Sequence, residues 1–412
     1  MTGTSNRWKK CILIVIFTIS VICFYEYTIQ TKPTIHETVQ IGTTELQQTE
    51  QPTSSEIKKI TKVESKNKSS NKKKNSSGKS KERLDAISES KGSMVLLVTY
   101  LRSGSSFLGE IVQQVPNAIY SFEPIRPFMR DQTYLSTERG TCLFSSDNCS
   151  RTPDNVYNEV LKSIKEFYEC NLKRLPKSVL KKLAWGGPKC YQEKEIEKCL
   201  SEMNSVCKSG TRILKTIRLS MDVVDDLMYM FPDLKVIHLL RDPRGMLASR
   251  MKTLPGIGTK QLGMSRAGRA VCDRYDRDIR IAASFGVKYP NRIKTVLYEQ
   301  VVENPLDTSF QIFNFLGLQP KSNFDNWMKE HMTGDQSTAK PPDNRSGAYS
   351  TYRANSSLTM NGWRTRLDFK DVVKIDKECS YLYEYTGYLA VENPAQLQDM
   401  KISLRQKNEI FP

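Results

Sequence analysis

Residues 94–112 read MVLLVTYLRSGSSFLGEIV. The first seven residues are nearly all apolar, which predicts a strand buried on both faces. The apolar residues within 107–112 share one face of a helix. The residues between, 101–106, are small, polar and basic. The stretch therefore predicts a strand, a tight loop and a helix N-terminus, which is a backbone arrangement that binds phosphate.

The loop residues themselves suit an anion. Gly104 allows close backbone approach, Ser103, Ser105 and Ser106 carry hydroxyl donors, and Arg102 supplies positive charge. The Walker A pattern is related, but it has a lysine where Ser105 follows Gly104 here. A nucleotide kinase is therefore disfavoured. An ordinary serine-rich turn is the alternative at this point.

A second stretch, residues 235–250, reads KVIHLLRDPRGMLASR and again predicts a strand, a turn and a helix. Arg241 follows the strand at its carboxyl end, where open α/β sheets bind ligands. Pro243 ends the strand and can open the helix. Ser249 lies about two helical turns beyond Arg241. Both side chains could therefore reach one phosphate from different sides.

Together these motifs resemble the sulfotransferases that use 3′-phosphoadenylyl sulfate (PAPS). The sequences of these motifs are most similar to those of the Golgi carbohydrate 6-O-sulfotransferases, which act on galactose, N-acetylgalactosamine or N-acetylglucosamine. The resembling motifs occur in the family's order, at residues 102–107, 122–124, 241–244, 297–299 with 304–305, and 361–364.

The resemblance implies an α/β fold, with a mainly parallel central sheet flanked by helices and a P-loop-like cradle for PAPS. It implies no metal, because protein cations neutralise the phosphates. It also implies a set of donor-binding residues, namely Arg102, Ser103, Gly104, Ser105, Ser106, Phe107 and Leu108 for the 5′-phosphosulfate, Arg241, Asp242, Pro243, Arg244 and Ser249 around the 3′-phosphate, Tyr298 beside the adenine, and Trp363 and Arg364 in a closing loop.

Sulfuryl transfer to a hydroxyl needs a base to take the proton. A short strand predicted over 118–122 delivers Glu123 just before Pro124. Cytosolic members of the superfamily use histidine, but this chain has only 3, and none lies in a predicted site loop. The resemblance and this elimination both favour Glu123 as the base, with Arg102 as its catalytic partner on the leaving phosphate. A structural ion pair between Glu123 and Arg126 is the alternative.

Other segments have helix or strand patterns. Residues 211–218 predict a strand whose Lys215 and Arg218 either face the substrate or are edge charges. Helical spacing is found over 162–182, 222–229, 310–316 and 371–386, and a further strand is predicted over 292–297. The 361–364 motif has a simpler alternative as the entry to the last helix.

The N-terminal region indicates a membrane-bound protein. We expect a cytoplasmic tail at 1–10, a transmembrane signal-anchor at 11–29 and a disordered luminal stem at 30–92. A cleaved signal peptide is the alternative, but no small-residue cleavage site follows the apolar run. The sulfotransferase domain is expected over 93–390, and a C-terminal tail over 391–412.

Cysteine usage also indicates an oxidising lumen. Eight cysteines lie outside the apolar run, and six of them fall in a charged insertion at about 136–210, which predicts local disulfides. We also expect a disulfide between Cys272 and Cys379. A zinc site is the alternative, but no CxxC pair is present. Sequons for N-glycosylation start at Asn67, Asn75, Asn148, Asn344 and Asn355.

A net charge of +17 suits polyanionic ligands, and no nucleic-acid-binding module is evident. The predicted protein is a type II Golgi membrane enzyme that sulfates the 6-hydroxyl of a galactose, N-acetylgalactosamine or N-acetylglucosamine residue in a glycan. A homodimer is compatible with the sequence. The alternatives are a PAPS-dependent sulfotransferase for protein tyrosine or glycolipid, and a non-catalytic glycan-binding relative.

Overall fold

The structure is a computed structural model of the 412-residue chain. It describes residues 92–184, 196–253, 262–333 and 356–406. The predicted anchor at 11–29 and almost all of the predicted stem lie outside the described residues. No helix within the described ranges is long and apolar enough to cross a membrane.

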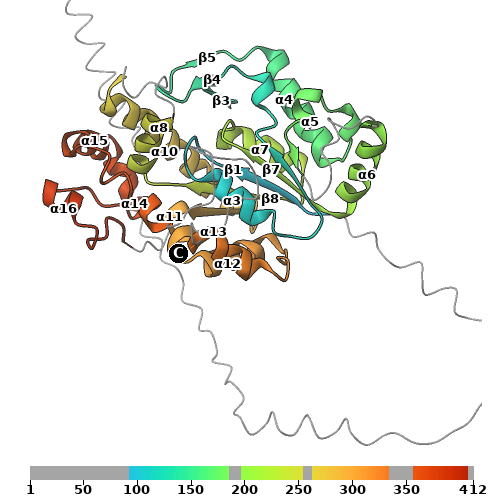
Figure 1. Cartoon of the computed structure of the whole chain (residues 1–412). Helices are drawn as coiled ribbons and strands as arrows, with labels where there is room; N and C mark the ends of the chain where they lie inside the picture. The colour runs from blue at the N-terminus through green and yellow to red at the C-terminus, as the bar shows by residue number, and fades with distance from the viewer. Residues whose placement is uncertain (1–91, 185–195, 254–261, 334–355, 407–412) are drawn as a thin grey trace, which may run out of the picture. The chain divides into compact units, whose positions relative to one another are not determined.

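A six-stranded sheet forms the centre of the described domain (Figure 1). Its strand order is β6 (Leu183–Ala184), β2 (Ala118–Phe122), β7 (Thr211–Thr216), β1 (Met94–Val98), β8 (Leu234–Leu240) and β9 (Ile293–Leu297). Every neighbouring pair is parallel except β2 with β6. The expected mainly parallel α/β fold is confirmed.

The two faces of β1 bury their side chains in two different hydrophobic clusters, because successive residues of a strand point to opposite faces. Met94, Leu96 and Val98 pack with helices α4 (Asp154–Tyr168), α6 (Ile196–Ser209) and α7 (Met221–Met230). Val95 and Leu97 pack with α3 (Ser105–Val112), α12 (Pro305–Leu316) and α13 (Phe324–Thr333). All five residues of β1 are buried. Helices therefore cover both faces of the sheet, as the apolar run predicted.

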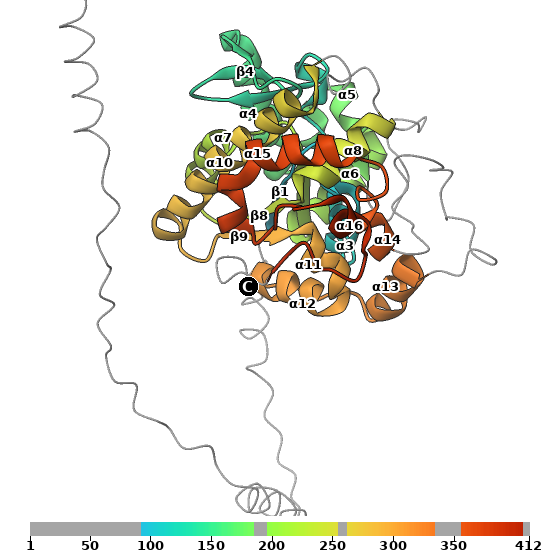
Figure 2. The ribbon, with the colours of Figure 1, turned by 90° about the vertical axis from the view of Figure 1, so that its left-hand side faces the viewer.

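A third cluster forms around the long helix α10 (Met264–Lys288), which the sequence analysis did not predict. It packs against α8 (Pro243–Thr253) and α15 (Phe369–Thr386), which Figure 2 shows lying across this side of the domain. Val391, Leu397 and Leu404 are buried in the same cluster, the second of them in α16 (Pro394–Gln398). The tail expected from residue 391 is therefore wrong, because the chain packs into the core well beyond 390.

A small antiparallel sheet spans the start of the insertion and consists of β3 (Thr133–Ser136), β4 (Gly140–Leu143) and β5 (Cys149–Ser150). The helical pattern over 162–182 proved to be the end of α4 and the short α5 (Lys177–Leu180), with a 3-10 turn at Leu172–Arg174 between them. The other short elements are η1 (Arg126–Phe128), α11 (Tyr298–Glu303) and α14 (Ser356–Asn361).

Disulfides join these parts of the fold. The Cys142–Cys149 disulfide joins β4 to β5 in the small sheet. Cys170, just after α4, is bonded to Cys207 near the end of α6, and Cys272–Cys379 joins α10 to α15. Cys199 is also disulfide-bonded, so every cysteine in the described ranges is oxidised. The predicted local bridges and the Cys272–Cys379 pair are confirmed, and the zinc alternative is wrong for these cysteines.

Candidate active site

The predicted site residues gather at the carboxyl edge of the parallel strands. The loop at 101–104 follows β1, Arg241 follows β8, and Glu123 follows β2. Strand β7 lies between β2 and β1, pairing Lys215 with Phe122 on one side and Leu97 on the other. Glu123 and the loop are therefore about two strand spacings apart, or roughly 10 Å.

The loop after β1 is held in shape by its own hydrogen bonds. The Ser103 side chain is fully buried, and its Oγ donates to the Tyr100 carbonyl at 2.9 Å and accepts from the Tyr100 amide at 3.1 Å. Gly104 has φ of 91°, and a Cβ placed there would lie 2.3 Å from Cδ2 of Tyr298. Only glycine fits this position, so the loop can press against the tyrosine ring while α3 begins at Ser105.

Two arginines connect the two predicted phosphate motifs. Arg102 Nε donates to Ser249 Oγ at 2.9 Å, and Arg241 donates to the Arg102 carbonyl at 3.1 Å. The Arg241 guanidinium lies over the Tyr298 ring at 4.4 Å. Its Nε is buried and has no hydrogen-bond partner in the described part of the chain. The structure thus brings Arg102, Arg241, Ser249 and Tyr298 together, and it leaves a buried donor of the cation unsatisfied.

Glu123 has the other distinctive geometry at this edge. The φ angle of Glu123 is 52° and that of Arg102 is 70°. These are two of the seven described non-glycine residues with a positive φ. Strained backbone of this kind clusters at functional sites. The Glu123 side chain is buried, and Oε1 accepts from Lys215 Nζ at 2.7 Å and from the Ile217 amide at 3.1 Å.

The second oxygen of Glu123 is different. Oε2 is buried without a hydrogen-bond partner among the described residues, and Arg218 Nε lies 3.9 Å from it. The alternative ion pair with Arg126 is wrong, because Arg126 contacts Asp131 at 3.3 Å instead. The edge-charge interpretation of Lys215 and Arg218 is also wrong, because both side chains are buried next to Glu123.

Arg244 and Asp242 contact each other. Arg244 is fully buried, pairs with Asp242 at 2.9 Å and Asp376 at 3.3 Å, and lies 4.3 Å over the Trp363 ring. Burial lowers the pKa of Arg244, but the two carboxylates outweigh burial and raise it above its ordinary value. Pro243 begins α8 and is buried. We therefore assign Asp242, Pro243, Arg244 and Trp363 a structural role behind the site.

Arg364 also has a full set of protein partners. Its guanidinium donates to four backbone carbonyls, those of Gln396 at 2.7 Å, Leu397 at 3.0 Å, Asp399 at 2.6 Å and Ile402 at 2.9 Å. It secures the C-terminal segment, so we leave it out of the proposed donor site. We leave out Phe107 and Leu108 as well, because their side chains belong to the core.

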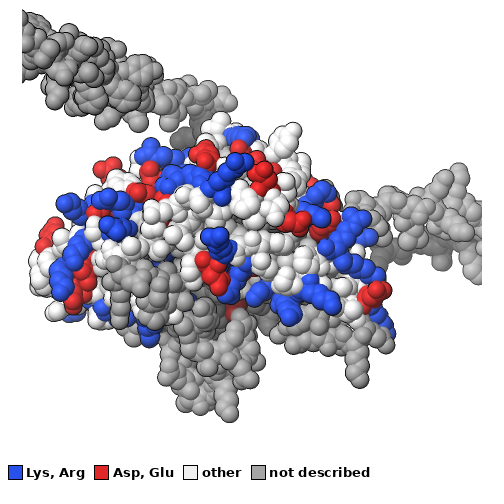
Figure 3. Space-filling view, turned by 90° about the horizontal axis from the view of Figure 1, so that it is seen from above, with Lys and Arg blue, Asp and Glu red and all other residues white. Residues whose placement is uncertain are grey.

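The sequence analysis missed two buried arginines close to this edge. Arg250 directly follows Ser249, and Arg274 lies on the unpredicted helix α10. Figure 3 shows Lys and Arg side chains intermixed with Asp and Glu on the face that it presents. Lys215, Arg218 and Arg241 at the site are instead buried, which composition alone cannot indicate.

Comparisons with known proteins identify the family of this chain. Residues 93–322, more than half of the chain, match the sulfotransferase family. Carbohydrate sulfotransferase 1 of Danio rerio is 26% identical over 357 residues, which cover 77% of this chain and 83% of that protein. Human carbohydrate sulfotransferase 3 is 26% identical over 367 residues, with 77% and 71% covered. The chain belongs to the sulfotransferase family, and it is a transferase.

Among solved structures, a mouse sulfotransferase complexed with PAP is similar, with 11% sequence identity and a TM-score of 0.39. The similarity covers 72% of this chain and 86% of that chain.

Proposed function

We propose that this chain transfers a sulfuryl group from PAPS to the 6-hydroxyl of a galactose, N-acetylgalactosamine or N-acetylglucosamine residue in a glycan or glycosaminoglycan. The observation that carries the proposal is the buried Glu123, whose Oε2 has no hydrogen-bond partner among the described residues, at the strand edge that also holds Arg102 and Arg241. The relatives are named carbohydrate sulfotransferases, which favours a sugar acceptor.

The residues present fit a donor that carries two separate phosphate groups. The first amides of α3, from Ser105 and Ser106, have no partner within the helix and can bind phosphate oxygens. Gly104 keeps the loop free of a side chain, and Arg102 supplies charge beside it. Arg241 and Ser249 would hold the 3′-phosphate, where the unsatisfied Nε of Arg241 gains a partner. Tyr298 would form the wall behind them.

PAPS supplies an activated sulfuryl group. As the sulfur–oxygen bond to the acceptor hydroxyl forms and the bond to the phosphate breaks, Glu123 Oε2 would take the hydroxyl proton. Lys215 is a positioning residue here, because it holds Oε1 and so fixes the direction of Oε2. Arg102 would neutralise charge that develops on the leaving phosphate.

We also propose that residues 11–29 anchor the chain in the Golgi membrane, with the catalytic domain in the lumen. The disulfides of the described domain support an oxidising compartment.

The acceptor can be identified with the full chain in detergent. Radiolabelled PAPS would be offered with desulfated keratan, desulfated chondroitin and glycans that end in N-acetylglucosamine, and Arg241→Ala would be run beside the wild type. We expect label on the 6-hydroxyl of one sugar, and weaker PAPS binding by Arg241→Ala. Transfer only to tyrosine peptides or lipids would overturn the sugar acceptor. A folded protein that does not bind PAPS would overturn the whole proposal.

A further inference from the structure

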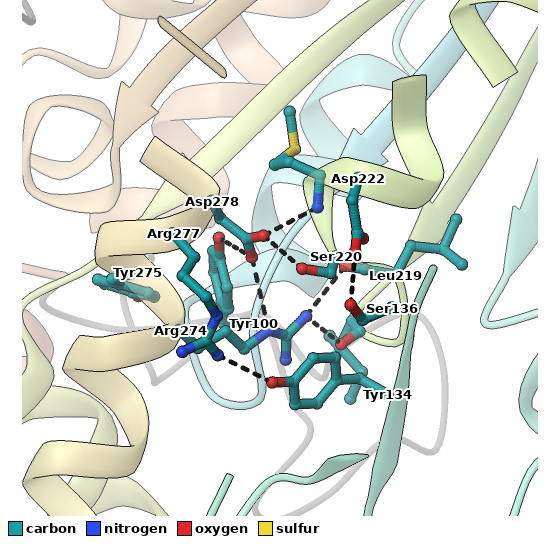
Figure 4. A network of polar contacts seen from close by, with 12 residues as sticks. Tyr100, Tyr134, Ser136, Leu219, Ser220, Asp222, Arg274, Tyr275, Arg277 and Asp278 are labelled. Atoms are coloured by element: carbon teal, nitrogen blue, oxygen red, sulfur yellow. Dashed lines mark hydrogen bonds and ion pairs between the residues drawn. The ribbon is translucent and has the colours of Figure 1, made fainter. Parts of the chain in front are cut away.

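A buried ion pair on helix α10 lies behind the strand edge that carries the candidate site. Arg274 is 4% exposed and Asp278 is fully buried, and Arg274 Nε lies 3.5 Å from Asp278 Oδ2, one helical turn away (Figure 4). The proposed mechanism uses neither residue. A buried ion pair by itself contributes little net stability, because both charges must leave water. The hydrogen bonds that the pair makes to other parts of the fold therefore indicate its role.

Arg274 holds the segment that directly follows strand β7. Its Nη2 donates to the Ile217 carbonyl at 3.3 Å and to the Leu219 carbonyl at 3.0 Å. The amide of the same Ile217 donates to Glu123 Oε1 at 3.1 Å. Ile217 is thus bound to the proposed base through its amide and to Arg274 through its carbonyl. A shift of the Arg274 side chain would therefore move the donor that orients Glu123.

Asp278 holds the start of the proposed donor loop. Its Oδ2 accepts a hydrogen bond from Tyr100 Oη at 2.7 Å. Burial, together with the charge of Asp278, raises the pKa of Tyr100 well above its ordinary value, so the hydroxyl keeps the proton that it donates. The backbone of Tyr100 is in turn bonded to Ser103 Oγ, with the amide at 3.1 Å and the carbonyl at 2.9 Å. Asp278 therefore fixes the residue from which the loop at 101–104 departs.

The other oxygen of Asp278 returns to the segment that Arg274 holds. Oδ1 accepts from the Ser220 hydroxyl at 2.6 Å and from the Met221 amide at 2.8 Å, at the beginning of α7. A carboxylate is well placed there, because the first amides of a helix have no partner within the helix. One turn of α10 therefore contacts both the donor loop, which follows β1, and the 217–221 segment, which contacts the base that follows β2.

We infer that Arg274 and Asp278 are positioning residues that keep the proposed base and the donor loop in a fixed relative position. The inference rests on the proposed function and deepens it. In-line transfer requires the acceptor hydroxyl and the sulfuryl group to be aligned, and a misplacement of about 1 Å can cost roughly 100-fold in rate. Neither residue touches the substrate, and their effect passes through Ile217 and Tyr100.

Two conservative variants of the full-length chain test the two links. Arg274→Lys keeps the charge but loses the planar guanidinium that donates to two carbonyls while it faces its carboxylate partner. Arg280→Lys is its control, because Arg280 forms an ion pair one turn away on the same helix but is exposed. Tyr100→Phe removes only a hydroxyl. Its control is Tyr168→Phe, which removes a buried hydroxyl bonded to the carbonyl of Val95, earlier in β1.

The two variants should affect different kinetic quantities. We expect Arg274→Lys to lower kcat by about 10- to 100-fold while the Kd for PAPS stays within about 3-fold. Tyr100→Phe should weaken PAPS binding by about 3- to 10-fold, which is the loss of one hydrogen bond that supports the loop. Both control variants should keep the wild-type kcat and PAPS affinity. Wild-type kcat in Arg274→Lys would overturn the inference.

A double-mutant cycle distinguishes positioning of the base from a general structural defect. If Arg274 acts through Glu123, adding Arg274→Lys to Glu123→Gln should change the remaining kcat by less than about 3-fold. The same 10- to 100-fold loss in both backgrounds would show that Arg274 does not act through the base, and would overturn its positioning role.

Hydrogen–deuterium exchange of the 217–221 segment tests the link to Ile217 with no acceptor present. We expect faster exchange there in Arg274→Lys than in Arg280→Lys, because the segment loses its bonds to α10 only in the first variant. Equal exchange in the two variants would overturn the inference. Faster exchange in Arg274→Lys, in a protein whose wild type transfers no sulfuryl group, would support the link and overturn the proposed function instead.

Discussion

The close packing of Gly104 against Tyr298 provides a quantitative test of how the donor loop is built. Replacing Gly104 by alanine puts a side chain on a residue whose φ is 91°, and the new Cβ would lie 2.3 Å from the Tyr298 ring. The positive φ costs roughly 1–2 kcal/mol for a residue with a Cβ. The steric overlap adds about 1–3 kcal/mol if the ring or the loop must move.

We therefore expect Gly104→Ala to lower the free energy of unfolding by about 2–5 kcal/mol and to weaken PAPS binding, because the displaced loop no longer presents its amides. Gly286→Ala is the control, since a Cβ there meets nothing within 4 Å. Gly286→Ala should leave the free energy of unfolding unchanged or raise it slightly, because Gly286 lies in helix α10.

A double-mutant cycle separates the two terms. Combining Gly104→Ala with Tyr298→Ala removes the overlap but keeps the φ cost, so the pair should be less destabilising than the sum of the single changes. Urea denaturation gives the free energies, and calorimetry gives the PAPS affinity. Wild-type stability and affinity in Gly104→Ala would refute the loop geometry described here.

Three further predictions concern stability. Arg364→Ala removes four bonds to the C-terminal segment, so it should lower the free energy of unfolding by roughly 2–4 kcal/mol without changing PAPS affinity; weaker PAPS binding at unchanged stability would contradict the structural role. Replacing both Cys272 and Cys379 by serine removes a disulfide between cysteines 107 residues apart. Because the disulfide restricts the unfolded chain, its loss should lower the free energy of unfolding by about 4–5 kcal/mol, measured by urea denaturation. An unchanged urea midpoint would argue against this disulfide. Burial, helped by Arg274, lowers the pKa of His238 to about 3, while the unfolded chain takes up that proton near pH 6.5. Stability from this group should therefore be full above pH 6.5 and fall as the pH drops toward 3, by up to roughly 1.4 kcal/mol per unit, and His238→Gln should remove this part of the slope; an identical slope in the variant would show that His238 is not responsible.

Much of the fold could be predicted because it depends on local patterns. The apolar run of β1 predicted a strand buried on both faces, and the strand–turn–helix order of 235–250 predicted β8 and α8. The helix α10 was missed even though its apolar stripe is regular. Its middle carries many charged residues, and the burial of Arg274 among aromatic rings depends on partners distant in the sequence.

The site was predicted less completely, for a similar reason. Short motifs indicate which residues cluster, but they do not show where each side chain points. Arg244 and Arg364 lie inside motifs that suggested phosphate binding, yet their guanidinium groups are held by carboxylates and backbone carbonyls. Arg250 was not predicted to be near the site, because the residues next to it in the sequence do not indicate that its side chain is buried.

The most direct test of the central claim is the rate of sulfuryl transfer by Glu123→Gln, with PAPS affinity measured on the same preparation. Glutamine keeps the size of the side chain but cannot accept the hydroxyl proton. If Glu123 is the base, kcat should fall by about 10²- to 10⁴-fold while the Kd for PAPS stays within about 3-fold. A kcat within a few-fold of the wild type, in protein that binds PAPS normally, would contradict the assignment.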